Sequence, residues 1–300
     1  MNKEDLEKYK HIRSGGSGFY EQKRGLIAVW GKEAVQFLDG LISNDMKTLE
    51  DGRQMLAAFP NAQGRLLAVV RVMRQGERYL FETEHVTREK LFRNLFRFTF
   101  AGDFFVEDMS DQYKYHEVFG SEPGAVATGF LFNSACSTDR FVETADADDF
   151  RSDLIATGTV ELSDELHELL RIEAGTPKYA FDMDETTIVP ELGLDGLISY
   201  NKGCYIGQEI IARIHFRGHV AKRLTGLVSE PGAIATGFLP GTDITSVDGK
   251  NAGRITSVTF SPKLERTIAL AFVRFDFLAA GTKLVVGDSN AVVTDLPFIS

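Results

Sequence analysis

The sequence contains only two cysteines, Cys136 and Cys204, and they are far apart in the chain. A disulfide-stabilised secreted domain needs more cysteines, and a structural zinc site needs a tighter group of ligands. No uninterrupted apolar run approaches the roughly 18 residues of a membrane span. The first eleven residues are polar and charged, unlike a signal peptide. We therefore expect a cytoplasmic protein with no membrane contact and no metal site.

Positive charge is also in deficit, because 33 Lys and Arg residues stand against 43 Asp and Glu residues, giving a net charge of −10. A chain this acidic is a poor general binder of nucleic acid, so no nucleic-acid partner is expected. It can still hold an anionic small molecule where Arg and Lys cluster locally. At 300 residues it can bury a sizeable core and divide into two or three domains.

Residues 1–218 show a mixture of strand and helix patterns. Strand-like runs at 53–59 and 65–73 flank a turn at 61–64, which predicts a hairpin. Thr87 is expected to cap a helix with Leu91 and Leu95 on its apolar face. Ser163 is expected to open a further helix, which Gly175 and Pro177 end.

After residue 219 the helical period disappears. Short β-rich runs recur between turn residues, at 224–229, 242–247, 253–260, 267–273, 283–286 and 291–295. This pattern predicts a small antiparallel barrel. The expected fold class is therefore α+β, with an α/β region over 1–218 and a C-terminal β barrel over 219–300.

Cys204 has unusual neighbours for a buried cysteine, since Gly203 and Gly207 bracket it and Lys202 lies two residues before it. A thiolate is stabilised by nearby positive charge or by a helix N-terminus, and residues 208–214 have helical character. These features favour a reactive thiol with Lys202 as its activating charge; the alternative is an inert core cysteine. Cys136 has no such setting and is interpreted as structural or incidental.

Two further groups carry possible binding chemistry. Four carboxylates lie within ten positions, and each can accept two parallel hydrogen bonds from a flat pair of donors; they are Asp182, Asp184, Glu185 and Glu191. A basic run that includes Arg213 follows and can meet an anionic ligand. For both groups a solvated surface segment is the alternative. His215 and His219 lack the further ligands of a zinc site.

Several motifs resemble the glycine-cleavage T-protein superfamily, and one resembles its YgfZ-like folate-binding branch. The segment Lys202-Gly-Cys-Tyr-Ile-Gly-Gln-Glu209 is similar to the signature of that branch. The superfamily motifs span most of the chain; they include Asn61-Ala-Gln-Gly-Arg65, Arg171-Ile-Glu-Ala-Gly-Thr-Pro177, Pro190-Glu191 and Gly253-Arg-Ile-Thr-Ser257.

The resemblance implies a tetrahydrofolate site at the centre of a multidomain ring of mixed α/β domains, one of them discontinuous, with the barrel as the last domain. It implies that Glu191 binds the pterin edge, and Asp182, Tyr179 and Arg213 are the other expected folate-binding residues. It also implies a folate-dependent role in iron–sulfur cluster assembly or repair, in which Cys204 and Lys202 are the reactive residues. Expected partners are folate and iron–sulfur client proteins or assembly factors.

One departure from the superfamily concerns its enzymatic activity. T-proteins carry an acidic residue in the strand after the 61–65 turn, where this chain has Ala68 and Val69 and no carboxylate between 64 and 71. Proton transfer near the folate nitrogens then lacks its usual agent. The first hypothesis is therefore an accessory protein, and the alternative is a folate-dependent aminomethyltransferase. The sequence leaves open whether Cys204 contacts a cluster, a persulfide or a partner thiol.

Overall fold

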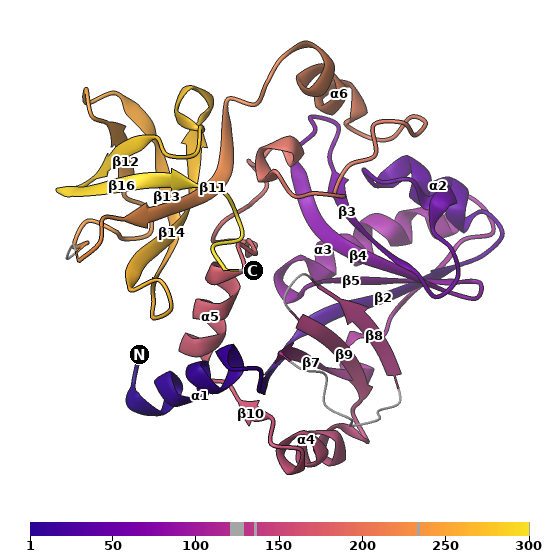
Figure 1. Cartoon of the computed structure of the whole chain (residues 1–300). Helices are drawn as coiled ribbons and strands as arrows, with labels where there is room; N and C mark the ends of the chain where they lie inside the picture. The colour runs from indigo at the N-terminus through magenta and orange to yellow at the C-terminus, as the bar shows by residue number, and fades with distance from the viewer. Residues whose placement is uncertain (121–128, 135–136, 233–234, 300) are drawn as a thin grey trace. The chain divides into compact units, whose positions relative to one another are not determined.

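The computed structural model describes the whole 300-residue chain except residues 121–128, 135–136, 233–234 and 300 (Figure 1). Cys136, interpreted above as structural or incidental, lies outside the described residues. The chain divides into two compact units, and each unit consists of three separate segments of the sequence. Unit 1 comprises residues 1–60, 67–167 and 196–206, and unit 2 comprises residues 61–66, 168–195 and 207–300. In the described part, no helix is long and apolar enough to cross a membrane.

Unit 1 contains two five-stranded sheets. The first has the order β3-β4-β5-β2-β6, with bounds β3 Gln54–Pro60, β4 Leu66–Gln75, β5 Arg78–Glu84, β2 Arg24–Trp30 and β6 Phe105–Asp108. The second has the order β10-β1-β7-β9-β8, with bounds β10 Val160–Glu161, β1 Ser17–Gln22, β7 Tyr113–Gly120, β9 Ser137–Glu143 and β8 Gly129–Asn133. The predicted hairpin is confirmed as β3 and β4.

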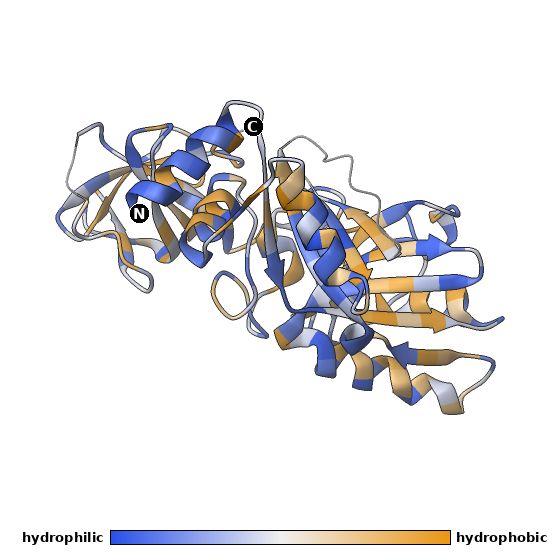
Figure 2. Ribbon diagram, turned by 90° about the horizontal axis from the view of Figure 1, so that it is seen from below, coloured by the Kyte–Doolittle hydropathy of each residue, from blue (hydrophilic) through white to orange (hydrophobic). Residues whose placement is uncertain are grey.

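The helices are distributed along the whole described chain. The α-helices are α1 Lys3–Arg13, α2 Ala34–Leu41, α3 His85–Phe96, α4 Ala147–Ala156, α5 Asp164–Glu173 and α6 Gln208–Arg217. Short 3₁₀ helices are η1 Met46–Thr48, η2 Arg97–Phe100, η3 Ser110–Gln112, η4 Val189–Leu192 and η5 Phe275–Phe277. Helix α1, beside the N-terminal label in Figure 2, is mostly blue because most of its residues are hydrophilic.

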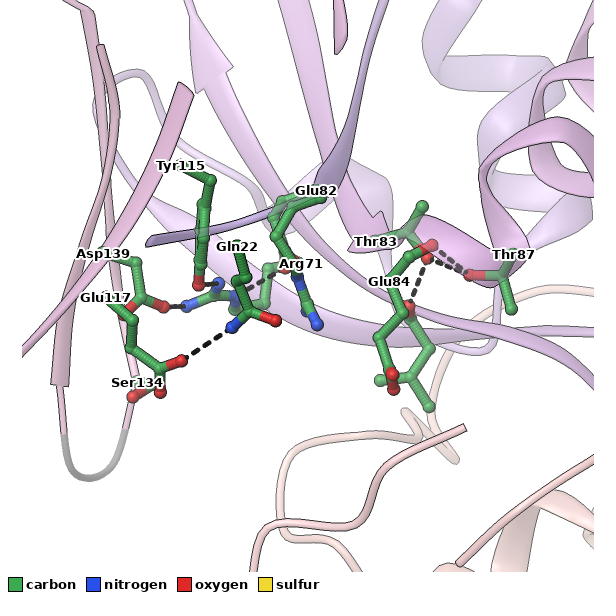
Figure 3. A network of polar contacts seen from close by, with 12 residues as sticks. Gln22, Arg71, Glu82, Thr83, Glu84, Thr87, Tyr115, Glu117, Ser134 and Asp139 are labelled. Atoms are coloured by element: carbon green, nitrogen blue, oxygen red, sulfur yellow. Dashed lines mark hydrogen bonds and ion pairs between the residues drawn. The ribbon is translucent and has the colours of Figure 1, made fainter. Parts of the chain in front are cut away.

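Two helix starts test the capping predictions. Ser163 caps α5 as expected, since its hydroxyl accepts a hydrogen bond from the Leu166 N–H. The prediction for Thr87 is wrong, because α3 begins at His85 with Glu84 as its N-cap. The Thr87 hydroxyl instead donates to the Glu84 carbonyl and meets the Thr83 hydroxyl, so it reinforces the first turn from inside (Figure 3).

Strand alternation places the core of unit 1 on both faces of its first sheet. On one face, strand residues such as Val70 and Phe81 pack with Leu38 of α2 and Leu91 of α3. On the other face, the intervening residues pack against the second sheet, in a cluster of Leu26, Ala28, Leu80, Tyr115, Phe132 and Phe141. The outer face of the second sheet covers Phe150 and Leu154 of α4. Unit 1 is therefore layered as helices, sheet, sheet and helix.

A buried ionic network joins the two sheets of unit 1 (Figure 3). Arg71 of β4 donates to Glu82 of β5 at 2.7 Å and to the Tyr115 hydroxyl at 3.0 Å, and it also pairs with Asp139. Arg24 donates to the second oxygen of Glu82 at 2.6 Å. Glu82 and Asp139 are only 2% and 1% exposed. The network thus places charged groups where the two sheets would otherwise meet through apolar contacts alone.

The pKa values of the two carboxyl groups in this network are shifted in opposite directions. Burial alone would raise the pKa of Glu82, but Arg24 and Arg71 outweigh it and lower that pKa. Burial raises the pKa of Asp139 despite the opposing charge of Arg71. Glu82 is therefore the firmly ionised partner of both guanidinium groups.

Unit 2 contains the predicted barrel, which is confirmed as a closed sheet in the order β11-β14-β13-β12-β15-β16. The strands are β11 Lys222–Ser229, β12 Asp243–Ser246, β13 Asn251–Ser261, β14 Arg266–Arg274, β15 Lys283–Val286 and β16 Ser289–Thr294. Antiparallel pairing of β11 with β16 closes it, and residues such as Leu227, Ile255 and Val293 fill its interior. The expected α+β fold with a C-terminal antiparallel barrel is confirmed.

Replacing Arg71 by Met should destabilise the protein by about 3–5 kcal/mol, because Asp139 loses its guanidinium partner and Glu82 loses one of two. Urea denaturation monitored by circular dichroism measures the change. Arg93→Met is the matched control, since Arg93 forms only an exposed i,i+4 pair with Glu89 and should have little effect. Equal stability of the two variants would contradict a stabilising role for the network.

Candidate functional site

Glu191 lies on η4, a single turn that has Ile188 as its N-cap and Gly193 as its C-cap. The Ile188 N–H donates to Glu191 Oε2 at 3.2 Å. No other described residue donates a hydrogen bond to this carboxylate, although the residue is only 4% exposed. A nearly buried carboxylate with one open oxygen is costly unless something completes its hydrogen bonds. Glu191 therefore has the features of a ligand anchor.

The turn 61–65 supports η4 from one side. The Leu66 N–H donates to the Thr187 carbonyl and the Val189 N–H donates to the Gly64 carbonyl, at 2.9 and 3.1 Å. Gly64 has φ +70°, and a Cβ there would lie 3.2 Å from the Cβ of Ile210 in α6. The position therefore favours glycine for both conformation and space. These hydrogen bonds hold the turn and η4 together, and α6 lies close beside the turn within unit 2.

Burial raises the pKa of the Glu191 carboxyl above its ordinary range. The Ile188 N–H and the charges of Lys222 and Arg65 act in the opposite direction. Neither cation forms an ion pair with Glu191, so the carboxylate keeps its open oxygen. This combination suits a ligand that donates hydrogen bonds to an ionised acid.

Asp182, expected to bind folate, is engaged by unit 2 itself. Arg171 and Ser257 each donate to it at 2.7 Å, and the Lys178 N–H donates at 3.0 Å. Thr256 also donates to it. Four donors saturate a carboxylate, so these contacts indicate a structural role in attaching the 178–183 segment to the barrel strand β13. Direct contact with a pterin is therefore not what the Asp182 environment favours.

The other two expected folate-binding residues also belong to unit 2. Tyr179 is buried, and its main chain forms a bridge with Met183 across a turn in which Ala180 has φ +67°. Arg213 is exposed on α6, and α6 contacts η4. Tyr179 and Arg213 thus belong to the unit that carries Glu191, and their contact with folate stays a prediction.

Cys204 belongs to unit 1, on the segment 196–206, and its residue is exposed. The segment is anchored to the end of α2 and the residues after it. The Ser199 N–H donates to the Ser43 carbonyl at 3.0 Å, and the Ile206 N–H donates to the Gly40 carbonyl at 3.0 Å. Asn44 donates its side-chain amide to the Gly196 carbonyl at 2.7 Å. The segment therefore presents the cysteine on a well-attached loop.

Lys202 contributes the strongest of these anchors. Its side chain has no exposed surface. Its ammonium group donates to the carbonyls of Asp39, Ile42 and Asn44 at 2.6, 3.0 and 2.6 Å. Nζ also lies 3.1 Å from Asp39 Oδ1. Its donors are thus used at the C-terminal end of α2, where cations are favourable.

These contacts change the role we assign to Lys202. The sequence suggested that its charge activates the thiolate, but three carbonyls and a carboxylate already use its donors. Burial lowers the pKa of Lys202 against the opposing effect of Asp39. Lys202 therefore anchors the loop of Cys204, and its action on the thiolate stays a prediction.

Sequence reasoning did not identify the partners of that loop. Ser43 is fully buried, donates to the Leu197 carbonyl at 2.6 Å and accepts from the Ala58 N–H. Asp39 is buried and forms ion pairs with two lysines, Lys47 and Lys202. Phe37-Leu38 and Asn44-Asp45 also resemble a motif of the T-protein superfamily, and this resemblance is the signal that could have pointed to the region.

The expected residues thus form two groups. Cys204 and Lys202 lie in unit 1, whereas Glu191, Asp182, Tyr179 and Arg213 lie in unit 2. Among the described residues, no group of three or more His, Cys, Asp or Glu side chains is arranged to hold a metal ion.

Two family models match the chain. The GCVT N-terminal domain matches residues 5–148, and the glycine cleavage T-protein C-terminal barrel domain matches residues 222–299. The crystal structure of aminomethyltransferase T from Bartonella henselae is 19% identical, with a TM-score of 0.85 over 98% of this chain and 89% of that chain. At this identity the likeness concerns the fold.

Two curated relatives bear on function. The iron-sulfur cluster assembly factor IBA57 homolog of Mycosarcoma maydis is 30% identical over 68% of this chain, and the match spans only 55% of that relative. The tRNA-modifying protein YgfZ of Cronobacter sakazakii is 23% identical over 90% of this chain and 88% of the relative.

Replacing Lys202 by Met should destabilise the protein by about 2–4 kcal/mol, since three carbonyls and Asp39 lose a buried donor. Hydrogen exchange of the Ser199 and Ile206 amides should accelerate more than that of amides in the barrel. Lys47→Met is the matched control, because Lys47 approaches the same Asp39 at 3.2 Å but is 66% exposed. An unchanged exchange rate in the Lys202 variant would rule out the anchoring role.

Proposed function

Because the chain belongs to the glycine-cleavage T-protein superfamily, we propose that it is a tetrahydrofolate-binding accessory protein in iron–sulfur cluster assembly or repair. Glu191 provides the observation that carries the proposal. It is a nearly buried carboxylate with one main-chain donor and one open oxygen. The amino-pyrimidinone edge of a pterin offers two adjacent N–H donors, which match the acceptor geometry of a carboxylate.

The role in iron–sulfur metabolism is supported by the name of one relative, an iron-sulfur cluster assembly factor. The YgfZ relative, which is named a tRNA-modifying protein, supports the YgfZ-like branch of the family. Cys204 supplies the second chemical element, a thiol on an anchored surface loop. An exposed thiol is accessible to a macromolecular partner, whereas a core cysteine is not. We propose cluster-assembly factors or client proteins as those partners, and the cytoplasm as the location.

Aminomethyl transfer is the second candidate, favoured by the fold that the chain shares with an aminomethyltransferase. Strand β4 argues against it. Ala68 points into the apolar core and Val69 follows it, so no carboxylate lies where the superfamily enzymes have one. A one-carbon transfer assay with a lipoyl-bound aminomethyl donor separates the candidates, since turnover would favour the transferase.

Glu191→Gln should weaken tetrahydrofolate binding at least about tenfold, because an acceptor oxygen becomes a donor and a charge-assisted hydrogen bond of about 1.5–3 kcal/mol is lost. Isothermal titration calorimetry measures the affinity. Glu185→Gln is the control, since Glu185 is an exposed carboxylate six positions away and should bind like the wild type. If both variants bind equally well, Glu191 is not the pterin anchor.

Cys204→Ser should abolish the function in cells while changing the melting temperature by no more than about 1–2 °C, because the residue is exposed. The activity of iron–sulfur enzymes in cells that depend on the variant measures the first effect, and differential scanning fluorimetry the second. Iodoacetamide should also label Cys204 faster than Cys136 at neutral pH. Slow labelling of Cys204 together with a large loss of stability would identify a structural cysteine instead.

A further inference from the structure

Two cations, Arg65 and Lys222, act on the Glu191 carboxylate without forming an ion pair with it. Its one hydrogen-bond donor among the described residues is the Ile188 N–H, and no ion pair of the described part includes it. Glu82, which is also buried, is instead paired directly with Arg71 and Arg24. The arrangement around Glu191 differs from that pattern and calls for a physical reason.

Arg65 is fixed next to η4 by its main chain. It forms an antiparallel bridge with Ile188, the residue whose N–H donates to Glu191. Its own N–H donates to the Asn61 side chain at 3.0 Å, and its carbonyl accepts from the Asn61 N–H at 2.8 Å. The side chain is exposed and forms no ion pair with a described residue.

Lys222 approaches from the barrel. It begins β11, which packs against η4, and its main chain pairs with Arg274 of β14. Its Nζ lies 4.6 Å from the centre of the Phe272 ring, so the ammonium rests on an aromatic face. The same charge also lowers the pKa of Asp184. Lys222 is thus placed to act on two carboxylates without a direct ion pair to Glu191.

The other charges on the elements that contact η4 have different roles. Arg223 of β11 lays its stem against Gly193, where an added Cβ would lie 2.9 Å from its Cδ. Helix α6 contributes four ionisable side chains that are not among the groups acting on Glu191; they are Glu209, Arg213, His215 and Arg217.

We propose that Arg65 and Lys222 are positioning residues that keep Glu191 ionised from beyond hydrogen-bond range and leave its open oxygen to the ligand. A cation in direct contact would take up that oxygen and compete with the ligand. A more distant cation stabilises the charge through space without competition. This proposal rests on the proposed function, because it explains how the pterin anchor works.

The arrangement also defines a ligand class. An ionised carboxylate with a free oxygen selects an uncharged, flat group with two adjacent N–H donors, such as the 2-amino-4-oxopyrimidine edge. A ligand carboxylate at the same position would be repelled by Glu191, although Arg65 and Lys222 would attract it. Arg65 and Lys222 therefore act on the ligand only through the charge of Glu191. The affinity for the ligand should accordingly depend on whether Glu191 is ionised.

The sign of the pH effect follows from this. Binding needs the ionised form, so affinity falls as the pH drops through the pKa of Glu191. Removing a cation removes an influence that lowers this pKa, so the fall should begin at higher pH. For Arg65→Met and Lys222→Met we expect binding to be about three- to tenfold weaker near pH 5 and almost unchanged near pH 8.

The experiment titrates 5-formyltetrahydrofolate, a stable probe with the same pyrimidine edge, against each variant across this pH range. Lys263→Met is the control, since Lys263 is an exposed cation in the β13–β14 turn. The decisive comparison repeats Arg65→Met and Lys222→Met in a Glu191→Gln background. There both effects should vanish, because no ionisation remains to support. Weakening that persists in that background, or that is equal at every pH, would show direct ligand contact and overturn the proposal.

A second readout needs no ligand. Because the pKa of Glu191 is raised on folding, the wild type should lose stability relative to Glu191→Gln as the pH rises, and the loss should stop at the folded pKa. Arg65→Met and Lys222→Met should extend that loss to higher pH. An unshifted curve would overturn the inference even if the probe binds. If the two variants show the expected shift but the wild type binds no probe, the proposed function is overturned and the inference about Arg65 and Lys222 stands.

Discussion

A charge removed from water must find a partner inside the protein, and this requirement explains the contacts of the buried charged groups in both units. Glu82 lies between two guanidinium groups where the sheets of unit 1 meet. The Lys202 ammonium group donates hydrogen bonds to three carbonyls and forms an ion pair with Asp39. Asp182 receives four donors beside the barrel. Of the three carboxylates among these groups, Glu191 alone keeps an open oxygen, and that exception identifies the candidate site.

The fold could be predicted largely from local patterns. Alternation of apolar residues with turns between them predicted all six barrel strands, and the 61–64 turn predicted the hairpin. The family assignment from short motifs is also confirmed. The start of α3 was misplaced because Thr87 is a typical capping residue, whereas the true cap, Glu84, makes no side-chain hydrogen bond to the helix. A Thr inside the first turn of a helix cannot be distinguished from a Thr at the N-cap by residue type alone.

The environment of the site residues could not be predicted in this way. The three carbonyls bound by Lys202 lie 158 to 163 positions away in the sequence, and main-chain oxygens have no residue signature. The position of Lys202 two residues before Cys204 predicted a charge that acts on the thiolate, but it gave no sign of these anchoring contacts. Asp182 and Glu191 are both acidic and close in sequence, yet one is saturated by donors and the other is open. Only the positions of distant donors distinguish these two carboxylates.

The interleaving of the two units has a consequence for synthesis on the ribosome. The chain passes between them at 60–61, 66–67, 167–168, 195–196 and 206–207. Unit 1 lacks its last segment until residue 206 has left the ribosome. Until then Asp39, Ser43 and Asn44 cannot form their contacts with residues 196–202, and unit 2 is also still incomplete. N-terminal domains usually fold first during translation. This chain offers no such early domain, and no single cut would release either unit as a continuous fragment.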